Sequence, residues 1–334
     1  MSDRRPELPP RFASPAETTD RPLWSVMIPT YNCAGYLRET LASVLAQDPG
    51  PDQMQIEVVD DCSTDNPQAI VDELAPTRVS FHQQAENRGH THNFNTCIER
   101  SRGRLIHLLH GDDTVRDGFY RTLAQPFHDH PDLGAAFCRY ISMNSDGDWE
   151  TIAALEPDGR GILSGWLERI ALGQRLQPPT IVVRRSVYEA IGGFDPRAGL
   201  MGEDWEMWVR IAAHYPVWYE PEPLALYRVH DSSITSALSA ERYVRELRTV
   251  IDLNRRLLPP ERADQISEEA LEIAATTAIR RAGRLLYAGR EGVAWTQVRA
   301  ALRTSRSTTV LERLGLFVLL WMRVRIRRIL DQLP

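Results

Sequence analysis

Short apolar runs alternate with segments of helical spacing through residues 23–141, and this alternation constrains the fold more than any other feature of the chain. Each run has the length and apolar character of a buried strand. The runs cover residues 23–30, 55–59, 79–82, 105–109 and 135–141. Strands that alternate with helices predict an α/β fold, with a mostly parallel sheet flanked by helices. Ligands of such sheets bind beyond the carboxyl ends of the strands.

Composition divides the chain into three parts. Residues 1–22 are rich in proline and charge and hold no apolar segment, so we expect a disordered leader. Residues 23–238 carry the strand–helix pattern and predict one α/β domain. Residues 239–334 are expected to form a C-terminal helical region. No apolar run reaches the ~20 residues that a helix needs to cross a bilayer, so no transmembrane helix is expected.

Polar residues follow three of the expected strands directly. Residues 30–32 (Thr-Tyr-Asn) follow the first strand, residues 60–61 (Asp-Asp) the second and residues 112–113 (Asp-Asp) the fourth. Because the carboxyl ends of parallel strands share one edge of a sheet, we expect the three clusters to face the same rim. For the second cluster, a helix cap is the alternative, with Ser63 or Asp65 capping the next helix.

The adjacent carboxylates of Asp112 and Asp113 suggest a cation site. Two neighbouring carboxylates repel each other unless a positive charge lies close by, and oxygen ligands suit Mg²⁺ or Mn²⁺. A solvated turn is the alternative, because Gly-Asp-Asp-Thr also favours turns. Further along, Arg228 and His230 end another strand-like run, where the arginine is able to bind diphosphate and the histidine a metal.

Glu203 and Asp204 stand at the start of a predicted helix. Acidic residues are favoured there by the helix dipole, which gives a purely structural explanation. In the functional interpretation, each carboxylate raises the pKa of its neighbour, and one of them serves as a general base.

Several function classes are excluded or disfavoured. All 39 basic residues are arginine, so neither a phosphate-loop lysine nor a pyridoxal Schiff base is available. The net charge of −6 argues against nucleic acid as a partner. No dinucleotide-binding glycine motif lies between a strand and a helix. Zinc hydrolysis is disfavoured because the spacing and expected strand geometry do not suit a zinc site at His90, His92, His107 and His110.

Taken together, the motifs resemble the family 2 inverting glycosyltransferases of the GT-A fold. The resemblance covers about two thirds of the chain, and the order and spacing of the motifs carry it. The motifs are residues 28–32 (IPTYN), 58–65 (VVDDCSTD), 87–89 (NRG), 109–113 (LHGDD), 192–195 (GGFD), 203–205 (EDW) and 227–230 (YRVH).

The resemblance implies a role for each matching residue. It makes Asp204 the catalytic base and Asp113 a ligand of Mg²⁺ or Mn²⁺. His110 stands where the family often has an acidic residue, which leaves His230 as the expected second metal ligand. The implied nucleotide-sugar-binding residues are Pro29, Thr30, Tyr31, Asp61, Asn87, Asp112 and Arg228. Of these, Asp61 accepts a hydrogen bond from the base, typically uracil, and Asp112 approaches the ribose.

The implied function is transfer of a sugar from a nucleoside diphosphate, expected to be UDP, to an acceptor hydroxyl with inversion. The acceptor is expected to be a saccharide or lipid-linked, in bacterial polysaccharide or glycoconjugate synthesis. A nucleotidyltransferase and a non-catalytic nucleotide-sugar-binding protein remain as alternatives.

The C-terminal tail contains a pattern that indicates the expected location of the protein in the cell. Residues 314–321 are apolar, and arginines follow at once. This pattern suits an interfacial helix on anionic lipid, so we expect a cytoplasmic protein with peripheral contact at the inner face of the membrane through residues 314–330. Packing of Leu316, Leu319, Leu320 and Ile329 on the preceding helices is the alternative.

Overall fold

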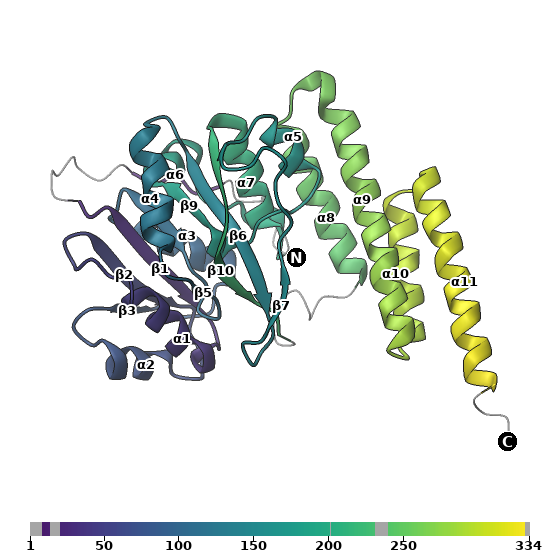
Figure 1. The fold of residues 1–334 in the computed structure, drawn as a ribbon, viewed down its shortest axis with the longest axis horizontal. Helices are drawn as coiled ribbons and strands as arrows, with labels where there is room; N and C mark the ends of the chain where they lie inside the picture. The colour runs from purple at the N-terminus through teal and green to yellow at the C-terminus, as the bar shows by residue number, and fades with distance from the viewer. Residues whose placement is uncertain (1–8, 14–20, 201, 231–239, 331–334) are drawn as a thin grey trace. The chain divides into compact units, whose positions relative to one another are not determined.

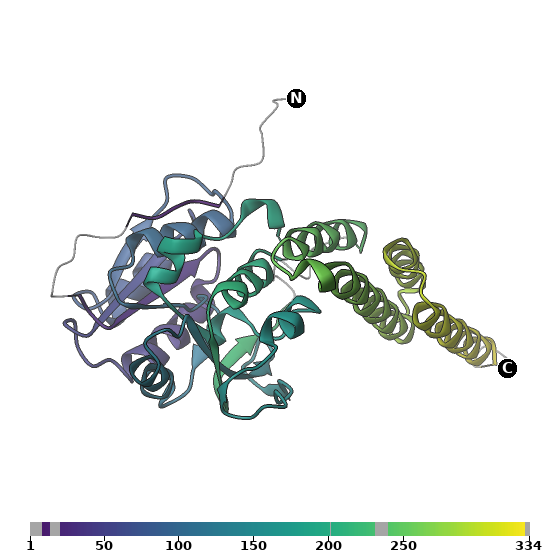
Figure 2. The same cartoon turned by 90° about the horizontal axis from the view of Figure 1, so that it is seen from above.

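A computed structural model of the chain describes residues 9–13, 21–200, 202–230 and 240–330. The chain forms two compact units (Figures 1 and 2). The sheet unit comprises residues 1–166 and 175–236, and the helical unit comprises residues 167–174 and 237–334.

The first half of the sheet is parallel, as the sequence predicts. The strands lie in the order β3-β2-β1-β4, and neighbouring strands of this set run in the same direction. Their bounds are β1 (Trp24–Thr30), β2 (Met54–Asp60), β3 (Ser80–Gln83) and β4 (Leu105–Leu108). Both β1 and β2 are buried along their whole length, which explains their continuous apolar character.

Beyond β4 the sheet is mixed, and its order continues β9-β6-β10-β5. β9 runs antiparallel to β4 and β6, β10 runs parallel to β6, and β5 runs antiparallel to β10. The bounds are β5 (Thr114–Val115), β6 (Ala135–Met143), β9 (Ile181–Arg184) and β10 (Val217–Arg228), with β7 (Trp149–Ile152) and β8 (Gly161–Ile162) paired at the side. The strand-like run that the sequence predicts before His230 is therefore the end of β10, which begins at Val217.

Helices lie on both sides of the sheet (Figures 1 and 2). Val26 and Ile28 of β1 share one apolar cluster with residues of α1 and α4, whereas α3 contacts β1 and β2 without contributing to that cluster. The helices of the sheet unit are α1 (Ala34–Leu45), α2 (Pro67–Leu74), α3 (His90–Arg100), α4 (Phe119–Asp129), α6 (Arg185–Ile191) and α7 (Glu203–His214). The last of these begins at the predicted acidic pair.

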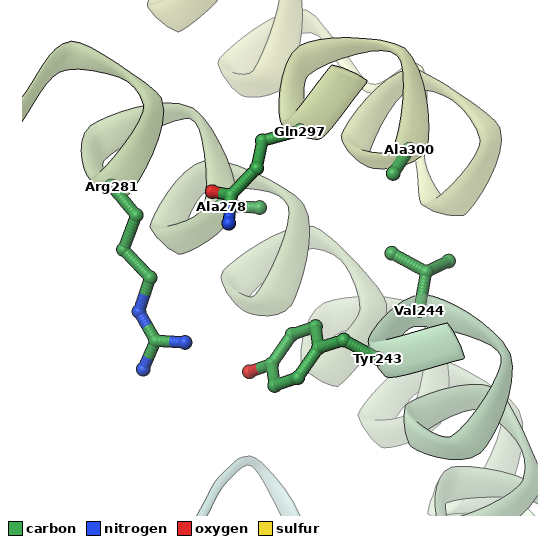
Figure 3. A pocket seen from close by; sticks show the side chains of 6 residues that line it. All are labelled: Tyr243, Val244, Ala278, Arg281, Gln297 and Ala300. Carbon is green, nitrogen blue, oxygen red and sulfur yellow. The ribbon is translucent and has the colours of Figure 1, made fainter. Parts of the chain in front are cut away.

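The helical unit has its own apolar core. It contains α8 (Ala240–Arg255), α9 (Pro260–Tyr287), α10 (Glu291–Thr304), α11 (Thr308–Leu330) and most of α5 (Trp166–Ala171). Figure 3 shows side chains of α8, α9 and α10 around a small pocket in this unit. There the guanidinium of Arg281 lies 5.5 Å from the ring centre of Tyr243.

Helix α11 divides into a packed and an exposed side. Phe317 is buried, and Leu320 and Trp321 pack against the same cluster. Leu316 and Leu319, for which packing is the alternative expectation, are 57% and 61% exposed. The side chain of Ile329 lies outside the described residues. None of the helices in the described ranges is long and apolar enough to cross a membrane.

Part of the expected leader contacts the sheet unit. The carbonyl of Pro10 accepts a hydrogen bond from the N–H of Gly193 (2.8 Å). The ring of Phe12 lies so close to Gly193 that an added Cβ would approach it to 2.8 Å. Residues 1–8 and 14–20 of the leader lie outside the described residues.

Candidate active site

The loops that follow β1, β2 and β4 are joined by backbone hydrogen bonds. The N–H of Asp61 donates to the carbonyl of Thr30 (2.9 Å), and the N–H of Gly111 donates to the carbonyl of Pro29 (3.1 Å). Gly111 leaves no room for a side chain, because an added Cβ would lie 2.5 Å from Cγ2 of Thr30. The three polar clusters of the sequence therefore lie at one edge of the sheet.

Asp60 holds the first two of these loops together. Its buried carboxylate accepts hydrogen bonds from the hydroxyl of Thr30 (3.3 Å) and the N–H of Ser63 (2.9 Å). The side-chain amide of Gln83 donates a third (3.1 Å). Thr30 thus turns its hydroxyl into the protein, whereas Tyr31 is 51% exposed and presents its ring to solvent.

Both carboxylate oxygens of Asp61 bind the loop that carries Asn87. The N–H of Arg88 donates to Oδ1 and the N–H of Gly89 donates to Oδ2, each at 2.9 Å. Gly89 has a φ of +87°, which favours glycine at this turn. Asn87 itself is exposed. Asp61 therefore fixes this loop, and each of its oxygens keeps a second lone pair for the nucleoside base that it is predicted to bind.

His110, Asp112 and Asp113 form a cluster in which each offers one ligand atom within 4.8 Å of the others. Asp113 is buried, and its Oδ1 accepts the N–H of Arg228 (2.8 Å). In the described part of the chain, neither Oδ2 of Asp113 nor Nε2 of His110 has a hydrogen-bond partner. A buried carboxylate oxygen without a partner is costly unless a cation neutralises it. This set of donor atoms fits a divalent cation.

Burial dominates the charge states in this cluster. Burial, reinforced by the charge of Asp112, raises the pKa of Asp113 well above its usual range. Burial lowers the pKa of His110, so its imidazole is neutral near pH 7 and able to act as a metal ligand. Burial opposes ionisation of Asp112 too, but the hydrogen bond with His230 outweighs it, and the pKa of Asp112 is lowered. A bound cation would favour the ionised form of Asp113.

His230 contacts one aspartate of the cluster. Its Nε2 lies 3.0 Å from Oδ2 of Asp112, whereas Nδ1 of His110 lies 3.9 Å from Oδ2 of Asp113. The sequence argument set His110 aside for its lack of negative charge, yet His110 is the histidine that joins the cluster of possible ligands. Metal binding by His230 stays a prediction. Its contact with Asp112 also allows it to orient a ligand from outside the metal site.

The side chain of Arg228 is buried and bonded to the protein. Its guanidinium lies 4.6 Å from the ring centre of Tyr36. Its acceptors are the carbonyls of Asp112, Asn144 and Ser145 and the carboxylate of Glu39, at distances of 2.7 to 3.3 Å. Diphosphate binding by Arg228 stays a prediction. Through these hydrogen bonds, the side chain of Arg228 stabilises the loop that carries Asp112 and Asp113.

Glu203 and Asp204 begin α7 and have different surroundings. Nε2 of His90 lies 2.9 Å from Oε1 of Glu203, and the N–H of Gly202 donates to Oε2 at 3.1 Å. Burial opposes ionisation of Glu203, but His90 outweighs it and lowers the pKa of Glu203. Burial, followed by the charge of Glu203, raises the pKa of Asp204 to about 8. Of the two carboxylates, Asp204 therefore has the basicity of a general base.

Phe94 of α3 separates the two histidines of the site. Its ring centre lies 5.5 Å from that of His90 and 4.9 Å from that of His110. In the sequence, His90 is conspicuous only as a possible zinc ligand, whereas His110 also stands where the family often has an acidic residue. His90 directly follows the Asn87–Gly89 turn, and His110 stands two positions before Asp112. These positions are the signal in the sequence that marks both histidines.

Tyr227 lies near both Asp204 and the aspartate cluster. Burial raises the pKa of Tyr227, and the negative charges of Asp113, Asp112 and Asp204 raise it further. These three carboxylates therefore lie within electrostatic range of one hydroxyl. The arrangement combines a candidate cation site with a carboxylate basic enough to accept a proton near neutral pH.

Comparison with solved structures shows the fold. Residues 1–349 of TarS from S. aureus, solved in complex with UDP-GlcNAc, match with a TM-score of 0.60 and 20% identity over 75% of this chain and 71% of that chain. The mannosyltransferase PcManGT from Pyrobaculum calidifontis, solved with GDP-Man and Mn²⁺, matches with a TM-score of 0.56 and 18% identity. This second match covers 97% of this chain and 86% of that one.

Sequence comparison gives the family. An uncharacterised protein of Mycobacterium tuberculosis is 28% identical over 247 residues, which cover 70% of this chain and 74% of the relative. The model of the glycosyl transferase family 2 matches residues 25–191, half of the chain. This range includes the strand ends, the loop bound by Asp61 and the His110–Asp113 cluster. With its GT-A-type fold and these motifs, the chain belongs to glycosyl transferase family 2.

Proposed function

We propose that this protein transfers a sugar from a nucleoside-diphosphate donor to an acceptor hydroxyl with inversion of the anomeric configuration. The observation that carries the proposal is the pairing of Asp113, whose buried Oδ2 has no partner among the described residues, with Asp204, whose pKa is raised to about 8. The first suits a cation beside a diphosphate, and the second suits proton removal from a hydroxyl.

The residues that would hold the cation are Asp113, Asp112 and His110, with His230 beside Asp112. Oxygen and imidazole donors suit Mg²⁺ or Mn²⁺, and the Mn²⁺ in the similar mannosyltransferase structure supports this choice. When bound, the ion supplies positive charge next to the diphosphate leaving group.

The chain's own residues account for the rest of the reaction. The acceptor oxygen forms a bond to the anomeric carbon as the bond from that carbon to the phosphate oxygen breaks. Asp204 takes the hydroxyl proton, and the nucleoside diphosphate leaves with the bonding electrons. A single displacement inverts the configuration, and no carboxylic acid is needed on the leaving oxygen, unlike in glycosidases. Asp61 and the exposed ring of Tyr31 are the proposed contacts for the nucleoside.

A UDP-linked donor is the proposal for nucleotide identity. The complex of TarS with UDP-GlcNAc supports it, whereas the mannosyltransferase binds GDP-Man. A nucleotidyltransferase and a non-catalytic nucleotide-sugar-binding protein are the competing functions. Hydrolysis of a panel of UDP- and GDP-sugars with and without Mn²⁺ separates them, because only a glycosyltransferase releases free sugar and nucleoside diphosphate. Release of a nucleoside monophosphate, or binding without turnover, would contradict the proposal.

We also propose a saccharide or lipid-linked acceptor, reached from the cytoplasmic face of a membrane. The exposed side of α11 supports this location. Its apolar residues are Leu311, Leu316, Leu319, Met322 and Ile326. Arg323, Arg325 and Arg327 are exposed on the same helix. An apolar stripe with adjacent arginines suits the interface of an anionic bilayer. Bacterial polysaccharide or glycoconjugate synthesis follows as the proposed destination.

A further inference from the structure

We propose that His90 is a positioning residue of the transfer reaction, linking the loop bound by Asp61 to the catalytic base through Glu203. This inference rests on the proposed function, because it assumes that Asp204 removes the acceptor proton. His90 is a histidine that the family motifs of the sequence do not include, and the reaction as described above leaves it without a role.

The first half of the link joins His90 to the nucleotide side of the site. His90 is the first residue of α3 and directly follows the two residues whose N–H groups bind Asp61. Those bonds fix the backbone at Arg88 and Gly89, so the position of His90 depends on them. A shift of this loop when a nucleoside reaches Asp61 would therefore move the imidazole.

The second half of the link joins His90 to the base. Nε2 of His90 lies 2.9 Å from Oε1 of Glu203, and the two side chains are only 13% and 8% exposed. A hydrogen bond between an imidazole and a carboxylate in such a buried place is directional. Glu203 is bonded at its other oxygen to the N–H of Gly202 and is the chain neighbour of Asp204. Glu203 is thereby held from both sides where it adjoins the base.

The charges of His90, Glu203 and Asp204 affect the pKa of one another. His90 faces Glu203, Asp204 and Asp61, so burial is outweighed and the pKa of His90 is raised. Burial and the charge of Glu203 raise the pKa of Asp204, whereas the N–H of Trp205 and His90 lower it. Asp204 in turn raises the pKa of Tyr227. Loss of the glutamate charge should therefore lower the pH at which Asp204 ionises. Loss of the histidine charge should raise that pH, provided that Glu203 stays ionised on the N–H of Gly202.

The test is a double-mutant cycle of His90→Gln and Glu203→Gln. The assay measures hydrolysis of the nucleotide sugar that the wild-type chain turns over fastest in the UDP- and GDP-sugar panel. We expect each single change to lower kcat ~10- to 100-fold, as misplacement of a reacting group does. The double mutant should be no slower than the slower single mutant, because both changes break one link. Calorimetric binding of UDP with Mn²⁺ should change less than about threefold in all three variants.

Two further measurements distinguish a role of His90 in positioning the base from a role in the stability of the fold alone. The acid limb of the pH–rate profile should move to lower pH in Glu203→Gln and to higher pH in His90→Gln. His92→Gln is the matched control, since His92 lies on the same helix and its side chain makes no hydrogen bond within the described residues. It should keep wild-type kcat and profile. If His90→Gln does not fold, kcat and the pH–rate profile are measured for His90→Asn and Glu203→Gln instead.

The inference is overturned if His90→Gln keeps wild-type kcat, if the two effects multiply in the double mutant, or if His92→Gln loses as much activity. In those cases wild-type turnover still supports the proposed function. If the wild-type chain neither binds UDP nor hydrolyses any nucleotide sugar, the proposed function fails and the role of His90 falls with it.

Discussion

The backbone N–H of Arg228 donates a 2.8 Å hydrogen bond to Oδ1 of Asp113, across 115 positions of the chain. This bond leaves the second oxygen of Asp113 as the one without a partner among the described residues. The end of β10 thereby orients an aspartate in the loop between β4 and β5. The donor is a backbone N–H, which every substitution at Arg228 except proline leaves in place. The candidate metal site is thus built by the pairing of distant strand ends.

The first prediction concerns the cation. Asp113→Ala removes the buried oxygen that fits a metal, so Mn²⁺ should no longer strengthen UDP binding. In the wild-type chain, calorimetric titration should show tighter UDP binding with Mn²⁺ than without. Asp117→Ala is the control, because Asp117 is an exposed aspartate four residues further along the chain, beyond β5. Equal affinity with and without Mn²⁺ in the wild-type chain would rule out the cation site.

The second prediction concerns the base. Asp204→Asn should lower turnover ~10²- to 10⁴-fold, which is the usual cost of losing a general base. UDP binding should stay within about threefold of wild type, since the predicted nucleoside contacts lie on other loops. Turnover by quenched-flow or coupled assay and calorimetric binding are measured on the same preparation. Full activity in this variant would transfer the role to another residue, and Glu203 would be the next candidate.

The third prediction concerns pH. A carboxyl whose pKa is raised to about 8 is mostly protonated at pH 7, and only its ionised form accepts a proton. Turnover at saturating Mn²⁺ should therefore rise as pH increases toward 8 and level off above it, by up to about tenfold per unit on the rising limb. The residual rate of Asp204→Asn should lack this limb. A wild-type profile that is flat from pH 6 to 9 would contradict the assignment.

The fourth prediction tests whether Arg228 braces the site. Arg228→Met removes the side-chain donor of the carbonyls of Asp112, Asn144 and Ser145. The carbonyl of Asn144 keeps the N–H of Gly147, and Ser145 is exposed, so about one buried group is left unpaired, at a cost of about 1–3 kcal/mol. We expect a loss of about 1–3 kcal/mol in the free energy of unfolding, measured by urea denaturation, together with weaker Mn²⁺ binding. Glu39→Gln removes only a partner that is 60% exposed, so it should cost less than about 1 kcal/mol. An Arg228→Met variant of wild-type stability that loses only UDP affinity would instead favour diphosphate binding.

The fifth prediction concerns α11. Leu316→Glu combined with Leu319→Glu replaces two exposed leucines of the apolar stripe, so binding to anionic vesicles should fall at least tenfold in co-sedimentation. Leu155→Glu is the matched control, because Leu155 is 59% exposed and lies in the sheet unit. Binding of the wild-type chain to vesicles should weaken with salt. No binding by the wild-type chain would remove the membrane from the proposal.

The sequence predicts the local elements well and the long-range pairings poorly. The apolar runs at 23–30 and 55–59 are strands because burial on both faces produces continuous hydrophobicity, which is readable from composition alone. The full length of β10 is not readable from the sequence, because Pro221 and Pro223 interrupt the apolar pattern where the register of β10 against β6 shifts.

In the site too, the local features are predictable from the sequence and the long-range contacts are not. Asp112 and Asp113 are conspicuous in the sequence because two acidic residues directly follow an apolar run. The contact between His90 and Glu203 is not, since it joins the starts of two helices 113 positions apart, from 90 to 203. No periodicity within either helix specifies that meeting. Arg228 is likewise expected from the sequence to bind a diphosphate, and only the tertiary structure shows that its guanidinium is buried among protein acceptors.

The contact of Phe12 and Pro10 with Gly193 bears on how the protein should be produced. An expression boundary drawn at the first strand, near residue 21, would cut away a backbone hydrogen bond and an aromatic ring that cover the turn preceding α7. That turn leads to the residues on which catalysis is proposed to depend. A shortened protein would then turn over slowly because the Gly192–Gly193 turn lacks its contacts with Pro10 and Phe12. Its low activity would be misinterpreted as evidence that the wrong donor sugar had been tested.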